Sequence, residues 1–225
     1  MAYRYLEEIR IASGNVNLYG DLQIPVTADA VVVFVHGSGS SRFSKRNREV
    51  AALLQRHHFG TLLFDLLTME EDMHYYNRLD IDLLTKRLVD VTAWIESFEA
   101  TKGIPIGYFG TGTGAAAALQ AAAKLPQINA VVSGSGRAHL AIDVLHRVNI
   151  PTLLIVGSLH EDILQLNKKA FAAMVCKKKL EIVEGANHLF EEPGKLEIVS
   201  ELACTWFKKY LLPMNSFKQD KCFTN

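Results

Sequence analysis

The stretch GYFGTGTGAAAAL, residues 107–119, decides the fold of this chain. An apolar strand, a glycine-rich turn and an alanine-rich helix start follow one another in it, and two kinds of site share that order. The first is a dinucleotide-binding turn of the G-x-G-x-x-A type, which holds a pyrophosphate at the helix N-terminus. The second is the G-x-S-x-G turn that presents the nucleophile of a serine hydrolase, here with Gly112 in the place of the serine.

Outward from this stretch, apolar runs of strand length alternate with helical patterns. A hairpin is expected over residues 8–13 and 16–24, turning at Gly14 and Asn15. Further strands are expected at residues 30–35, 61–67, 104–110, 128–133, 150–157 and 179–185. Amphipathic helices are expected at residues 84–98, 163–174 and 199–210, the first from the apolar stripe Leu84, Leu88, Val91, Ile95 and Phe98. Because parallel strands need crossover helices, the alternation predicts the α/β class: a mainly parallel sheet with an N-terminal antiparallel hairpin and helices on both faces.

Composition excludes several classes of function. The 24 Lys and Arg residues balance 24 Asp and Glu residues, so the formal net charge is zero and the pI is near 7.1. Such a chain lacks the broad positive field that attracts nucleic acid or an anionic membrane surface, so neither is expected as a partner. The N-terminal residues lack the apolar core of a signal peptide, and the longest apolar runs are only of strand length. We therefore expect a cytoplasmic protein.

No linker or break in composition divides the chain. A single domain over residues 1–212 is expected, followed by a polar tail over residues 213–225. Cys176, Cys204 and Cys222 have no paired spacing, so we expect free thiols, no disulfide framework and no metal site. No cofactor is expected.

The dinucleotide interpretation of the glycine-rich turn can be tested at the next strand. That strand should end in Asp or Glu about 20 residues after the turn, to bind the ribose hydroxyls. Here it continues into SGSGR, residues 133–137, without a carboxylate. The dinucleotide fingerprint also belongs to an early strand of its fold, whereas this turn follows at least four strand candidates. The pattern therefore favours the hydrolase interpretation.

The hydrolase interpretation requires an oxyanion loop early in the chain and a histidine late in it. VFVHGSGSSR, residues 33–42, places a turn at the end of a buried strand. There the backbone N–H group of Ser38, together with that of Thr113, is expected to face a developing oxyanion. GANHLFEEPG, residues 185–194, places His188 in the loop after the final strand, where the catalytic histidine is expected.

With TLLFDLLT, residues 61–68, and LLIVGSLHEDILQLN, residues 153–167, these motifs make the chain resemble the α/β-hydrolase superfamily, and within it the small dienelactone-hydrolase-like proteins. The matching blocks run through most of residues 30–212. The resemblance implies an α/β-hydrolase fold without a large lid, and hydrolysis of small esters or lactones through a Ser-His-Asp triad. It also places the serine position on Gly112 and the acid position on His160, so the nucleophile and the acid of the family are both absent.

Few side chains are candidates to replace the missing serine. Glycine at position 112 preserves the strained turn while removing the attacking oxygen. Thr111 and Thr113 flank it but project in other directions from a tight turn. Ser133 and Ser135 lie at the end of the adjacent strand. None of the four is the preferred nucleophile.

Other polar side chains near these motifs have both a functional and a structural interpretation. Asp162 is a candidate substitute acid, but it is also placed to cap the helix that follows. Arg42 and Arg137 are candidate substrate-binding residues for an anionic group, as is Arg46; the alternatives are a solvated helical turn for Arg42 and Arg46 and a structural salt bridge for Arg137. His36 is expected to support the oxyanion loop.

Two functions follow from the degenerate triad. The first is weak hydrolysis of small esters or lactones, with His188 activating water in the space of the missing serine oxygen. The alternative is a non-catalytic ligand-binding or regulatory pseudo-hydrolase, which keeps the pocket for an ester, lactone or related acyl ligand. The loss of two catalytic groups, at Gly112 and His160, favours the alternative.

Overall fold

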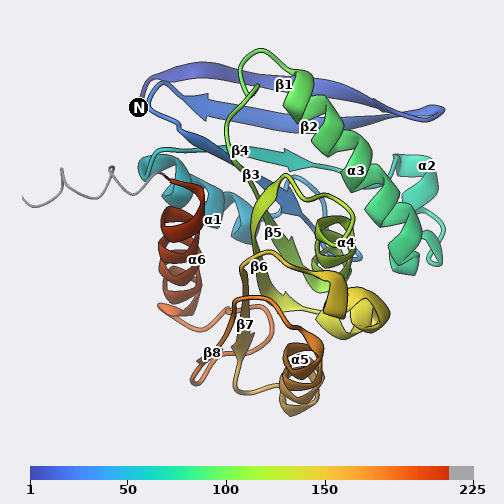
Figure 1. Ribbon diagram of the computed structural model, residues 1–225, viewed down its shortest axis with the longest axis vertical. Coiled ribbons are helices and arrows are strands. Elements are labelled where there is room, and N and C mark those ends of the chain that lie inside the picture. Colours follow the sequence, from blue (N-terminus) through green and yellow to red (C-terminus); the bar gives the residue numbers. More distant parts are fainter. Residues whose placement is uncertain (213–225) are drawn as a thin grey trace, which may run out of the picture.

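The computed structural model describes residues 1–212, which form eight strands and several helices (Figure 1). The polar tail expected over residues 213–225, with Cys222, lies outside the described residues. The elements in chain order are β1 (Tyr3–Ser13), β2 (Val16–Pro25), β3 (Ala30–Val35), α1 (Lys45–Arg56), β4 (Phe59–Phe64), α2 (Met69–Asp72), η1 (Asn77–Leu79), α3 (Ile81–Ser97), β5 (Ile106–Thr111), α4 (Gly112–Ala122), β6 (Ile128–Gly136), η2 (Ala138–Arg147), β7 (Thr152–Gly157), α5 (Glu161–Ala173), β8 (Lys178–Val183) and α6 (Lys195–Leu211).

All eight strands form one sheet in the order β1-β2-β4-β3-β5-β6-β7-β8. The hairpin β1–β2 turns at Gly14 and Asn15, with Ser13 opposite Val16, and β2 pairs antiparallel with β4. Every other pairing is parallel. The predicted fold class is confirmed: the sheet is mainly parallel and begins with an antiparallel hairpin.

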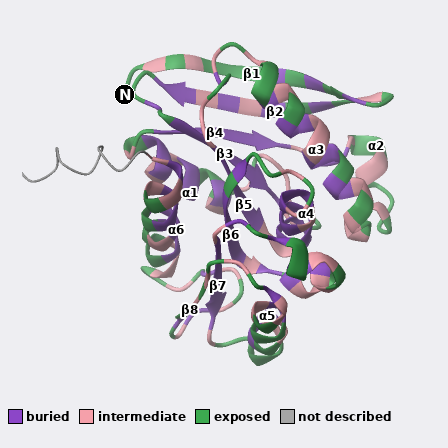
Figure 2. Ribbon diagram, in the orientation of Figure 1, coloured by how far each residue is buried: buried purple, intermediate pink, exposed green. Residues whose placement is uncertain are grey.

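Helices cover both faces of the sheet and create two apolar cores. On one face, α3, α4, η2 and α5 pack over a core that includes Leu88, Leu119 and Leu145. On the other face, α1 and α6 pack over a core that includes Leu54 and Phe207. Figure 1 shows the two groups of helices on opposite sides of the strands. The central strands are buried along their length, as their unbroken apolar sequences predict (Figure 2).

Several strands have limits that the apolar pattern does not predict. β4 ends at Phe64, although the apolar run continues to residue 67. The Asp65 N–H still donates to the Tyr19 carbonyl of β2 at 2.9 Å, but the Leu66 N–H donates to the His36 side chain at 3.1 Å. β6 continues through Gly136, three residues beyond the predicted end, because Ser133 and Gly134 still pair with β5. The polar SGSG sequence is therefore strand, and it lies beside the glycine-rich turn.

Within residues 1–212, no helix has the length and apolar character needed to cross a membrane. Cys176 and Cys204 are free thiols. In the same part of the chain, no group of three or more His, Cys, Asp or Glu side chains is arranged to hold a metal ion.

Candidate functional site

The glycine-rich turn joins β5 directly to α4, and its glycines are required by close packing. A Cβ atom on Gly114 would lie 2.1 Å from the Val35 carbonyl oxygen, and one on Gly110 would lie 2.6 Å from the Ala115 Cα. Gly112 stands at the apex with a φ of 51°, in the left-handed region. The turn therefore has the conformation that the hydrolase interpretation predicts, and the residue at its apex has no side chain.

The loop after β3 lies against this turn. A Cβ atom on Gly37 would lie 3.0 Å from the Thr111 carbonyl oxygen, so only glycine fits comfortably there. The Ser38 N–H donates to the Thr113 Oγ1 at 2.9 Å. The two residues predicted for the oxyanion hole thus lie together, but donation from Ser38 to an oxyanion would require this bond to break. The Thr113 N–H belongs to the first turn of α4, where no intrahelical acceptor exists.

The predicted histidine and the residue at the acid position contact each other. His188 Nδ1 lies 3.3 Å from His160 Nε2, and the ring centroids are 4.4 Å apart. Partial burial lowers the pKa of His188, as do the charges of His160 and Arg46, while Glu191 opposes them. The His188 imidazole is therefore mainly neutral at pH 7. A carboxylate in the place of His160 would instead stabilise the imidazolium.

Asp162, the predicted substitute acid, lies in the first turn of α5 and is exposed. Among the described residues it forms no hydrogen bond with His188. An acidic side chain in this position is favoured by the helix dipole.

An open cavity of about 250 Å³ lies over the turn. Its apolar wall includes Val50, Phe109, Phe190, Leu196 and Val199. Its polar lining includes Ser38, Ser40, Ser44, Thr111, Thr113, Ser135, His188, Arg46 and Arg137. No Asp or Glu is among the described residues that line the cavity.

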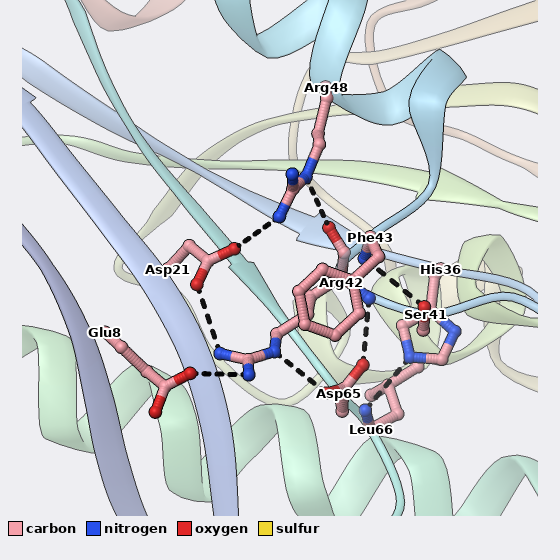
Figure 3. Close-up of polar contacts among 9 residues, drawn as sticks. All are labelled: Glu8, Asp21, His36, Ser41, Arg42, Phe43, Arg48, Asp65 and Leu66. Atoms are coloured by element: carbon pink, nitrogen blue, oxygen red, sulfur yellow. Dashed lines mark hydrogen bonds and ion pairs between the residues drawn. The ribbon is translucent and has the colours of Figure 1, made fainter.

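Arg42 lies away from this cavity, in a cluster of carboxylates (Figure 3). Its guanidinium pairs with Glu8 at 2.6 Å, Asp21 at 3.1 Å and Asp65 at 3.2 Å, and its side chain is only 10% exposed. This placement gives Arg42 a structural role and does not support the substrate-binding role predicted for it. The ion pairs of Arg42 depend on the tertiary fold, because the hairpin brings Glu8 and Asp21 next to the end of β4.

His36 is buried behind the oxyanion loop, and Figure 3 shows its ring next to Leu66. Its Nε2 accepts the Leu66 N–H at 3.1 Å, so Nδ1 carries the hydrogen and lies 3.0 Å from the Gly37 carbonyl oxygen. Burial lowers the pKa of His36 and keeps it neutral. These contacts are those of a loop-supporting residue.

The structure brings Arg46 and Arg137 to the cavity. The Arg137 N–H donates to the Gly112 carbonyl at 2.8 Å, which fixes the start of its side chain beside the turn. Arg46 lies in the first turn of α1, just after the capping residue Ser44. The sequence does not indicate the apolar residue Phe190, because the loop between His188 and α6 has no periodicity that would orient its side chains.

Comparisons with known proteins agree with this geometry. The profile of the Dienelactone hydrolase family matches residues 21–216. The crystal structure of a dienelactone hydrolase from Anabaena variabilis superposes with a TM-score of 0.89 at 45% identity, covering 92% of this chain and 99% of that one. Est1E from Butyrivibrio proteoclasticus shares the fold, with a TM-score of 0.75 at 15% identity over 90% of this chain and 98% of its own.

Two curated relatives come from Mycobacterium tuberculosis strains CDC 1551 and H37Rv, and both are named "putative phosphoribosyl transferase". Each is 52% identical to this chain over 207 residues, or 91% of the chain. The match covers 46% of each relative, so this chain corresponds to less than half of their length. Because the family profile spans most of the sequence, and the structure superposes closely on a dienelactone hydrolase of 45% identity, the chain belongs to the dienelactone hydrolase family.

Proposed function

We propose that this protein binds a small acyl or related ligand in the cavity over the Gly112 turn, without forming a covalent acyl-enzyme. The observation that carries the proposal is the apex of the turn, where Gly112 supplies no attacking oxygen. In a serine hydrolase this position must hold the nucleophile, because the turn projects only that side chain clear of the backbone.

The neighbouring hydroxyl groups support the same proposal. The Thr113 hydroxyl accepts the Ser38 N–H and is held by the oxyanion loop. The Ser133 and Ser135 hydroxyls are buried from solvent. A nucleophile needs an accessible oxygen beside a general base, so none of these three hydroxyls is placed for attack.

The pairing of His188 with His160 supports weak or absent turnover. In a serine-protease triad, loss of the acid alone costs on the order of 10⁴ in rate. An imidazole at position 160 can hold His188 in one tautomer, but unlike a carboxylate it offers no negative charge to stabilise the positive charge that His188 would acquire.

One observation favours a second candidate, in which His188 activates water for slow ester hydrolysis. His188 lines the cavity and is mainly neutral at pH 7, so it can accept a proton there. A positioned general base contributes typically 10² to 10⁴ in rate. The name phosphoribosyl transferase belongs to relatives of which this chain matches only 46%, so it does not support that activity here.

Two measurements on the unaltered protein test the proposal. A fluorophosphonate probe, which reacts with activated serine, is expected to label no residue, and phenyl acetate is expected to bind without a burst of released phenol. Slow turnover that His188→Ala abolishes, but the exposed control His74→Ala does not, would instead establish the water mechanism. Labelling of any Ser or Thr by the probe would refute the non-covalent proposal.

A further inference from the structure

The cavity over the Gly112 turn carries positive charge that no carboxylate in its lining balances. Arg137 forms no ion pair with any described residue, and Arg46 meets only Glu191, at 3.8 Å. Glu191 itself is largely exposed, with 57% of its side chain accessible, so this pair is weak. Two guanidinium groups are therefore available to a ligand in the cavity.

The floor of the same cavity is the start of α4, an 11-residue helix. Its N-cap, Thr111, makes no side-chain capping bond, so the first N–H groups of the helix lack the usual acceptor. The Arg137 N–H bond to the Gly112 carbonyl places one guanidinium-bearing residue next to these N–H groups. Two cationic residues thus line the cavity whose floor holds these N–H groups, at the place that a catalytic serine side chain would occupy.

The absence of that side chain leaves room for a bulky anionic group. A Cβ atom on Gly112 would have one neighbour within 4 Å, the Gly37 Cα at 3.2 Å, and the turn borders the open cavity. A phosphoryl group presents three terminal oxygens in different directions, whereas a carboxylate presents two in one plane. Helix N–H groups and Arg forks approaching from separate elements match the phosphoryl geometry better.

The rest of the cavity limits what the phosphoryl group is attached to. Its volume of about 250 Å³ is below the usual range for drug-sized ligands, and one wall consists of Val50, Phe109, Leu196 and Val199. We infer that the site binds a small phosphate monoester with an apolar substituent, the phosphoryl group lying over the Gly112 turn between Arg137 and Arg46. This inference rests on the proposal that the site binds its ligand without acylation.

Calorimetric titration tests the inference with four probes. Two carry phosphate, namely phenyl phosphate and inorganic phosphate. The other two are the carboxylate phenylacetate and the neutral ester phenyl acetate. Phenyl phosphate is expected to bind most tightly, and its affinity is expected to fall as salt rises. Arg137→Gln is expected to weaken it about tenfold or more, because hydrogen bonds to charged groups are strong. Arg56→Gln removes the same charge from an exposed position at the end of α1, outside the cavity, and is expected to change the affinity less than twofold.

The outcomes separate this inference from the function on which it rests. Failure of phenyl phosphate to bind, or binding that Arg137→Gln and Arg56→Gln weaken equally, would overturn the phosphoryl assignment. If phenyl acetate or phenylacetate binds more tightly than phenyl phosphate, the phosphoryl assignment is wrong while ligand binding stands. Inorganic phosphate binding as tightly as phenyl phosphate would refute the apolar substituent. Fluorophosphonate labelling would refute the non-covalent function itself.

Discussion

At the scale of single residues, position 112 separates the shape of the site from its chemistry. The left-handed φ of 51° at Gly112 costs glycine little but strains a residue with a side chain. Hydrolases tolerate this strain because it exposes their nucleophile. Here glycine relieves the strain and offers no side-chain oxygen, while the packing around Gly110 and Gly114 still maintains the turn. The turn therefore keeps its shape without a side chain at its apex.

Restoring both lost groups is expected to create an esterase. Gly112→Ser supplies the nucleophile, and His160→Asp supplies a carboxylate at the position that now contacts His188. The double variant is expected to hydrolyse phenyl acetate faster than Gly112→Ser alone by about 10² to 10⁴, since the acid is worth on the order of 10⁴ in serine proteases. Initial rates and fluorophosphonate labelling at position 112 measure this.

Gly112→Ser combined with His160→Asn is the matched control, because asparagine has the size of aspartate without its charge. Equal rates in the two double variants would show that a carboxylate at position 160 does not reach the His188 imidazole in a productive geometry.

At the scale of elements, the N-terminal hairpin is joined to the parallel part of the sheet by charge as well as by β2–β4 pairing. Arg42 links Glu8 of β1, Asp21 of β2 and Asp65 after β4 (Figure 3). The Arg42 N–H also donates to Asp65 at 2.8 Å, so the carboxylates hold both the side chain and the backbone of the loop after β3. This loop continues from the oxyanion turn, so the cluster positions one edge of the cavity.

Arg42→Ala is expected to lower the free energy of unfolding by about 2 kcal/mol, because it leaves the partly buried carboxylate of Asp65 without a cation. The change is measured as the shift of the urea unfolding midpoint. Arg48→Ala is the control, since Arg48 pairs with Asp21 from a half-exposed position and its loss is expected to cost less than about 1 kcal/mol. Equal losses of unfolding free energy in the two variants would show that the burial of Arg42 does not strengthen its ion pairs.

At the scale of the whole molecule, the cavity lies at the carboxyl ends of the parallel strands, and its apolar wall belongs to the core under α1 and α6. The loops after β3, β5, β6 and β8 all reach the cavity there, as is general for open α/β sheets. His36 lies behind this edge, and its burial connects the protonation of the molecule to its stability.

Stability is expected to fall as the pH decreases through about 6.5. Burial lowers the pKa of His36 below its ordinary value of about 6.5, so the unfolded chain binds more protons than the folded one in this range. The stabilising contribution of neutral His36 is complete above about pH 7 and is lost as the pH falls below about 6.5. It stops changing once the pH is below the pKa of His36 in the folded state. The pKa values of His57, His139 and His188 are shifted in the same direction.

Urea midpoints between about pH 7.5 and 5.5 measure this dependence. His36→Gln is expected to reduce the slope, because an amide oxygen can accept the Leu66 N–H without titrating. The exposed control His74→Gln is expected to retain it. An unchanged slope in His36→Gln would assign the pH dependence to other groups.

The sequence by itself determined the order of the eight strands and of the helices α3, α4, α5 and α6, the glycine-rich turn, the residue at its apex and the late histidine. These features depend on local chemistry: unbroken apolar runs predict buried strands, and a strained turn requires glycine at fixed spacing. The ends of β4 and β6 could not be predicted from the sequence, because they depend on how far each strand pairs with its neighbours in the sheet.

Only the tertiary structure decided which polar side chains share the site. Arg42 and Arg46 are four residues apart, and the sequence supports the same interpretations for both. In the structure, however, Arg42 is held by carboxylates of the hairpin while Arg46 lines the cavity. The contact between His160 and His188 joins loops 28 residues apart. Such contacts depend on how distant strands align at one edge of the sheet, and local residue patterns carry no record of that alignment.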